Sequence, residues 1–294
     1  MTATLTHDRL SPTIPLARSA RAELRRLLRW PVSWVLLGVW ILLNLLFTYV
    51  FDWISYRTGD ATGPADSVST IDGLLPHAIP DVLTQGMPLF GGALVTILGA
   101  LAVGSGYGWG TWKTVWTQGP SRVASFGGTL VALLVLVAGL VLLTVGIDLG
   151  MSSVIALVEG QAGAGLPELG ALATSTGAAV LILGMWAALG TAIGVLSRSP
   201  ALAAGLGLVW SLVVEQLLRG VANALPAIEG VTNRLPGASA GSLAGAVGAR
   251  PVSDGGAPGV LTALSGVAAT SWTVGYLVLG VAVALAVVAR RDLL

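Results

Sequence analysis

Six long apolar runs constrain the fold of this chain more than any other feature. Each is long enough to cross a hydrocarbon core of roughly 30 Å as an α-helix, and none alternates polar and apolar residues as a membrane β-strand does. They predict an all-α, polytopic membrane protein. The expected spans are Trp34–Phe51, Pro88–Gly104, Phe126–Ile147, Ala173–Leu196, Ala201–Leu218 and Trp272–Ala289.

Composition agrees with this class and narrows the chemistry. Hydrophobic residues make up 54% of the chain and charged residues 10%, and the mean hydropathy is +0.85. The net charge of +1, with no sizeable exposed basic domain, argues against a nucleic-acid partner. The chain has no cysteine, no HExxH motif and no phosphate-binding GxxxxGK[ST] loop. We therefore expect no catalytic residues, no metal site and no cofactor bound by this chain.

The distribution of charges predicts the orientation. Six crossings return both termini to one side of the membrane. That side, with the loops from even to odd spans, holds 11 of the 15 basic residues, whereas the other side holds 11 of the 14 acidic residues. Basic residues are retained in the cytoplasm, so we expect a plasma-membrane protein with both termini inside. We expect one domain over residues 1–294, composed of a flexible tail (1–15), an interfacial helix (16–30) and a six-span bundle (31–294).

The segment "ARSARAELRRLLRW" predicts a basic amphipathic helix before the first span. At about 100° per residue, Arg18, Arg21, Arg25 and Arg29 share one stripe, and leucines lie on the adjacent one. Such a helix would lie in the cytoplasmic interface with its leucines toward the acyl chains. One interpretation is a topology anchor and nothing more. The other is that the helix also contacts a soluble partner, for which Glu23 would be available.

The stretch "GSGYGWGTWKTVWTQGPSR" separates the second and third spans on the predicted cytoplasmic side. It contains the only lysine of the chain, Lys113, and its "TWKTVWTQ" segment predicts a short helix that ends before Gly119 and Pro120. Its three tryptophans allow two interpretations. They are either ordinary interfacial anchors or a knob that inserts into a groove of a partner, and the pattern favours the knob.

The two outer connections differ. Residues from about Asp52 to Met87 are acidic and rich in Gly, Pro, Ser and Thr. The connection Arg219–Ser271 is too long for a structureless loop, so we expect it to be structured. In it, Gly237, Gly241 and Gly245 are four apart, which permits close packing against another helix. The alternative is a glycine-alanine loop with chance spacing.

Ionisable residues are nearly absent from the expected spans, where only Glu215 lies, near an outer end. This weighs against a proton- or sodium-coupled carrier. Glu215 and Arg219 have the spacing of an intrahelical ion pair. They either neutralise each other at the interface or form an outer gate, with Asn44, Thr48 and Trp210 facing a central cavity.

Taken with the rest of the chain, "YGWGTWKTVWTQGPSR" resembles the region after the second span of membrane subunits of type II ABC exporters. The basic N-terminal helix, "SRSP" (197–200), "RLPG" (234–237) and the closing "ARRDLL" are similar to actinobacterial-type members. The family often has an acidic residue before the aromatic-glycine stretch, where this chain has Gly106.

The resemblance implies a permease subunit without its own ATPase, assembled with a second or homologous permease and with separate nucleotide-binding subunits that hold ATP and Mg. It implies short re-entrant helices at Gly237, Gly241 and Gly245. It implies a coupling helix that contacts the ATPase through Tyr107, Trp109, Thr111, Trp112, Lys113, Trp116 and Gln118. It implies a connecting helix that contacts the same subunit through Arg18, Arg21, Glu23, Arg25 and Arg29.

The expected function is the export of a hydrophobic or amphipathic substrate, such as a drug, antibiotic, peptide or lipid, with multidrug or antibiotic resistance as one outcome. A polysaccharide or teichoic-acid exporter is a variant of the same interpretation. The alternative from another class is a non-transporting membrane anchor or sensor that recruits an ATPase. A membrane enzyme ranks third, because no set of nucleophile, base and metal ligands is apparent in the sequence.

Overall fold

The structure is a computed structural model that describes residues 13–60, 69–117, 121–161, 163–254 and 256–290. Over these residues all of the regular secondary structure is helical, with no strand. Six helical stretches are long and apolar enough to cross a membrane, which confirms the predicted number. They are Pro31–Thr58, Met87–Gly108, Arg122–Val158, Leu169–Ser197, Pro200–Ala222 and Gly266–Arg290.

Three of these stretches change their helical winding part of the way along. The first is α2 (Pro31–Leu45), the π-helical segment η1 (Leu46–Val50) and α3 (Phe51–Thr58), and the second is η4 (Met87–Gly91) and α5 (Gly92–Gly108). The fifth is α9 (Pro200–Leu208), η5 (Val209–Val214) and α10 (Glu215–Ala224). A π-helical turn inserts extra residues and rotates all the side chains that follow it.

The remaining spans are single helices: α7 (Arg122–Val158), α8 (Leu169–Ser197) and α13 (Gly266–Arg290). With 37 residues, α7 is about 55 Å long at 1.5 Å per residue, well beyond a hydrocarbon core of roughly 30 Å. It begins at a Ser121 cap, whose Oγ accepts from the Ala124 backbone N–H at 3.2 Å. The helix continues past the predicted end at Ile147, so Asp148 belongs to the same helix as the third predicted span.

The centre of the bundle is the pair α5 and α8, which pack through small residues. A Cβ atom at Gly190 would meet the carbonyl oxygen of Thr96, and one at Gly194 would lie 2.8 Å from the carbonyl oxygen of Ala100. The two backbones can approach this closely only because these residues lack side chains. On its other side, α8 packs against α13, where Gly280 faces the Ala188 backbone.

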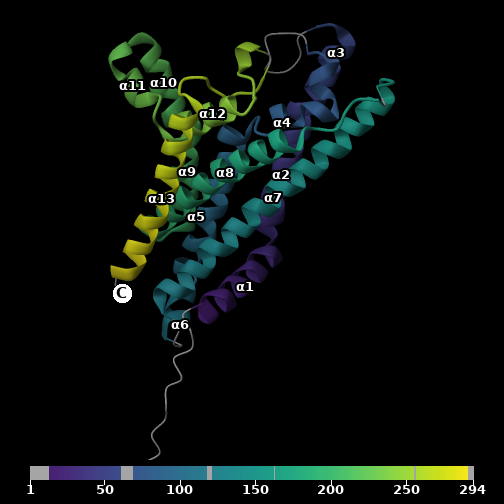
Figure 1. The fold of residues 1–294 in the computed structure, drawn as a ribbon. Helices are drawn as coiled ribbons and strands as arrows, with labels where there is room; N and C mark the ends of the chain where they lie inside the picture. The colour runs from purple at the N-terminus through teal and green to yellow at the C-terminus, as the bar shows by residue number, and fades with distance from the viewer. Residues whose placement is uncertain (1–12, 61–68, 118–120, 162, 255, 291–294) are drawn as a thin grey trace, which may run out of the picture.

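The outer connections form short helices at one end of the bundle (Figure 1). Between the fifth and sixth spans lie η6 (Pro226–Ile228), α11 (Glu229–Thr232), α12 (Pro236–Ala246) and η7 (Val252–Asp254). Between the first and second lie η2 (Ile71–Leu74), η3 (Pro76–Ala78) and α4 (Ile79–Val82). The expected structure in the long connection is therefore present.

At the opposite end, α1 (Thr13–Arg29) lies beside the start of α7, and α6 (Thr111–Thr117) connects α5 to α7 (Figure 1). Arg26 Nη2 donates to the Ala102 carbonyl at 2.8 Å, and Ser19 Oγ donates to the Ser125 carbonyl at 3.0 Å. Leu27 is fully buried among residues of α5 and α7. The leucine stripe of α1 thus packs partly on protein, whereas we expected it to face acyl chains.

The contact between α5 and α8 yields a stability prediction. We expect Gly190→Leu to lower the thermal unfolding midpoint of the detergent-purified protein, because overpacking a close contact costs about 1–3 kcal/mol. Gly177→Leu is the matched control on the same helix, since a Cβ there meets no heavy atom within 4 Å. Equal midpoints for the two variants would contradict the close backbone approach.

Candidate functional site

Trp112 holds α6 against the bundle. Its ring is 5% exposed, and its Nε1 donates to the Val103 carbonyl at 3.2 Å. The ring packs near Tyr107 and Phe126, and it occupies the space that a Cβ on Gly106 would need. We predicted that Trp112 would project toward a partner, and the structure corrects this. An acidic side chain at position 106 would also collide with this ring.

The outward surface of α6 is formed by other residues of the same stretch. Trp109 is 69% exposed, and Thr111 and Lys113 are exposed. The Trp109 ring meets Trp30 edge-on, with ring centroids 6.3 Å apart, and the Arg26 guanidinium lies 5.9 Å from the Trp30 centroid. These contacts connect α6 to the end of α1. Of the remaining predicted positions, Trp116 lies on α6, and Gln118 lies outside the described residues.

The basic side of α1 faces away from the bundle. Arg18, Arg21, Arg25 and Arg29 are all exposed. We expected Glu23 to be available to a partner, but its carboxylate forms an ion pair with Arg26 at 2.8 Å. The exposed face of α1 is therefore cationic along its length.

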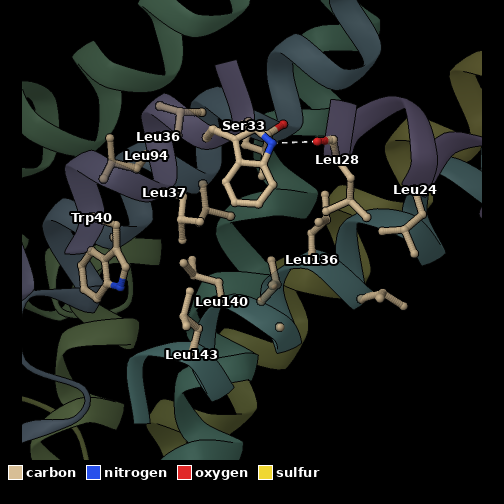
Figure 2. Close-up of a pocket in the computed structure, with 17 residues that line it drawn as sticks. Leu24, Leu28, Ser33, Leu36, Leu37, Trp40, Leu94, Leu136, Leu140 and Leu143 are labelled. Atoms are coloured by element: carbon tan, nitrogen blue, oxygen red, sulfur yellow. Dashed lines mark hydrogen bonds between the residues drawn. The ribbon is translucent and has the colours of Figure 1, made fainter. Parts of the chain in front are cut away.

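An apolar cavity lies beside α1, between α2, α5 and α7 (Figure 2). Its volume is about 320 Å³, within the range of small-molecule sites. Its walls are almost wholly aliphatic and include Leu36, Leu94, Leu136 and Leu140. This cavity was not predictable from hydropathy, because its walls come from four separate helices whose packing brings them together.

A buried polar pair joins the first and third spans. Asn44 Nδ2 donates to Asp148 Oδ1 at 2.8 Å, and the Asp148 side chain is fully buried. The Asp148 Oδ2 and Asn44 Oδ1 atoms are buried without a hydrogen-bond partner. One turn before this pair, Trp40 Nε1 donates to Thr144 Oγ1 at 2.9 Å. Intramembrane carboxylates are costly and usually functional, and this one was missed because α7 extends further than its hydropathy indicated.

Glu215 binds the start of α12. Its Oε2 accepts from the Gly237 backbone N–H at 2.8 Å, and its Oε1 accepts from Trp210 Nε1 at 2.9 Å. The carboxylate is 1% exposed and satisfies N–H groups that a helix leaves unpaired at its N-terminus. The ion pairs among described residues do not include one between Glu215 and Arg219, although the two charges are close enough to interact electrostatically. The Arg219 side chain instead lines a cavity of about 400 Å³ near α11.

The predicted outer-gate residues therefore divide between different contacts. Asn44 and Thr48 line one small space with Gln85 and Phe90, and Asn44 also binds Asp148. Trp210 and Glu215 face α12. The structure does not bring the five residues together around one cavity.

The three spaced glycines of α12 lie against neighbouring backbone and carboxylate atoms. A Cβ at Gly237 would meet the Glu215 carboxylate, one at Gly241 would meet the Gly259 carbonyl, and one at Gly245 would meet the Leu261 carbonyl. The Leu261 N–H donates to the Gly241 carbonyl at 3.1 Å. The partner of Gly241 and Gly245 is thus the connection that follows α12, whereas we expected another helix.

No protein-family model, curated protein or solved structure matches this chain. Across the described residues, no group of three or more His, Cys, Asp or Glu side chains could hold a metal ion.

The pair of Asn44 and Asp148 generates a double-variant prediction. We expect Asn44→Leu to destabilise the protein by about 1–3 kcal/mol, because it removes the amide that donates to a buried carboxylate. Asn44→Leu combined with Asp148→Leu should be closer to wild type, since removing both partners leaves no unsatisfied group. Thermal unfolding in detergent measures both variants. Additive losses in the double variant would contradict the pairing.

Glu215 generates a local prediction. We expect Glu215→Ala to speed amide hydrogen exchange at Gly237 by about tenfold or more, because hydrogen bonds to charged groups contribute about 1.5–3 kcal/mol. Glu229→Ala, which removes an exposed carboxylate near the same end, is the matched control. Unchanged protection of residues 236–246 in Glu215→Ala would show that the carboxylate does not hold α12.

Proposed function

We propose that this chain is the permease subunit of an ATP-driven exporter that works with a separate nucleotide-binding subunit. The observation that carries the proposal is the end of the bundle at which α1 and α6 lie (Figure 1). There the exposed Trp109 meets Trp30 at the end of α1, Lys113 of α6 is exposed, and the exposed face of α1 is cationic. Large aromatic and basic side chains of this kind dominate contact energies in protein interfaces. The sequence has no phosphate-binding loop, so the ATPase would be the partner that binds there.

The packing of α6 supports a coupling role for this surface. Buried Trp112 fixes α6 to α5 and α7, and the ring contact between Trp109 and Trp30 joins it to α1. A displacement of α6 by a partner would therefore pass to α5. Because α5 packs closely on α8, the displacement would continue into the centre of the bundle.

The orientation of the chain and the character of its pathway also belong to the proposal. The α1 and α6 end would face the cytoplasm, in agreement with the distribution of basic residues. The α10–α12 end would face outward, with α12 as a re-entrant cap. Two permeases would enclose the pathway, and the mainly aliphatic character of the chain suits a hydrophobic or amphipathic substrate such as a drug, antibiotic, peptide or lipid.

The first experiment is purification of the tagged chain from its native host in mild detergent, followed by mass spectrometry of the proteins that accompany it. We expect an ATPase with phosphate-loop motifs in near one-to-one ratio. Substrate movement in vesicles that requires ATP would then separate an exporter from a non-transporting anchor that recruits the same ATPase. Recovery of the chain alone, or with an unrelated enzyme, would contradict the proposal.

Surface variants test the proposed interface. We expect Trp109→Ala and Lys113→Glu to reduce recovery of the ATPase by about tenfold, the effect of losing one interface anchor. Trp272→Ala and Arg234→Glu are matched controls, since both residues are exposed and lie away from α6. Equal recovery in all four variants would place the ATPase contact elsewhere. Trp112→Ala is unsuitable, because its loss would also disturb the packing of α6.

A further inference from the structure

We propose that the cavity between α1, α2, α5 and α7 binds one acyl chain of an anionic phospholipid, with the phosphate headgroup beside the arginines of α1. The arginines of α1 also belong to the proposed ATPase surface, whereas no residue of α6 lines the cavity. The inference does not depend on the proposed function, since a membrane anchor would carry the same site.

The cavity has the dimensions and surface of an acyl-chain site. Its α2 wall extends from Ser33 to Trp40, and its α7 wall from Val135 to Leu143, which correspond to about 10 Å and 12 Å along the helices. The space is therefore elongated along the spans. Its volume of about 320 Å³ is bounded almost entirely by leucine, valine and tryptophan side chains. Such walls offer contacts to methylene groups and no hydrogen bonds to a polar ligand.

The polar groups of the cavity gather at one end. Ser33 Oγ lines the cavity and is buried without a hydrogen-bond partner. Beside it, Trp34 Nε1 donates to the Leu28 carbonyl at 2.7 Å, and both lie where α1 turns into α2 (Figure 2). Trp40 lies at the other end among leucines (Figure 2). A ligand with one polar end and one apolar chain matches this asymmetry, with its polar end toward Ser33 and the end of α1.

The positive charge of α1 determines which phospholipid headgroup the site prefers. Leu24 and Leu28 of α1 form part of the cavity wall, and the exposed Arg21 and Arg25 precede them by three positions each, on the adjacent stripe of the helix. The carboxylate of Glu23 is engaged by Arg26 and does not offset this charge. Guanidinium groups on the helix that borders an apolar cavity favour a phosphate over a neutral or zwitterionic headgroup.

Photolabelling tests the proposal on the full chain, together with any partner that purifies with it. The protein is reconstituted in nanodiscs of dioleoylphosphatidylcholine that contain a small, equal fraction of either phosphatidylglycerol or phosphatidylcholine with a diazirine in the acyl chain. We expect labelled peptides to map to residues 33–40 and 135–143. We expect the phosphatidylglycerol probe to label them about tenfold more, as two nearby arginines would favour an anionic lipid.

Two glycines of α7 provide a matched pair of variants. Gly139 lines the cavity, Gly146 does not, and a Cβ at either meets no heavy atom within 4 Å. Gly139→Leu should therefore fill the cavity without disturbing the fold, and we expect roughly tenfold less labelling at 135–143. Gly146→Leu should label as wild type. Equal unfolding midpoints establish that both variants are folded.

The arginines are tested separately from the cavity. Arg21→Gln combined with Arg25→Gln should abolish the preference for phosphatidylglycerol while labelling by phosphatidylcholine persists. Arg290→Gln, which removes an exposed arginine on α13, should change neither. Labelling that is unaffected by Gly139→Leu would overturn the acyl-chain site. Equal labelling by the two probes in the wild-type protein would overturn the assignment to an anionic lipid.

Discussion

The close approach of α5 and α8 is the contact on which the rest of the bundle depends. In an apolar solvent the hydrophobic effect does not drive helices together, so association relies on packing between surfaces that fit closely. Gly190 and Gly194 provide this fit against the backbone of α5, and Gly280 of α13 provides it on the other side of α8. Once this layer is formed, α7 and α1 add to one side, and α9 adds to another.

Polar side chains reinforce the packing at the few places where they enter the bundle. Trp40 binds Thr144 and Asn44 binds Asp148, so two hydrogen bonds one turn apart fix α2 against α7. Glu215 fixes the fifth span to α12. Each of these ties requires a specific register between two helices, because a polar group left unpaired in a hydrocarbon environment is costly. These hydrogen bonds fix the register between neighbouring helices, which contacts of glycine and leucine alone do not fix.

Hydropathy predicted the features that are determined within a single helix, and it missed the features that depend on contacts between two helices. The six spans, the helix at α1 and the structured outer connection were predictable, because length and composition determine them. The inward orientation of Trp112 was not, since it depends on the gap left by Gly106 on a neighbouring helix. The contacts of the predicted gate residues were not predictable for a related reason, because Asn44 binds Asp148 of α7 and Glu215 binds the start of α12.

The bond between Glu215 and Gly237 has a mechanical consequence. The carboxylate is on the fifth span, and the N–H it binds begins α12, which lies between that span and α13. The fifth span also reaches α5 through α9. A rotation of the fifth span about its own axis must therefore carry the first turn of α12 with it or break the bond. Through one carboxylate, the first turn of α12 and the far end of α9 are both coupled to a rotation of the fifth span.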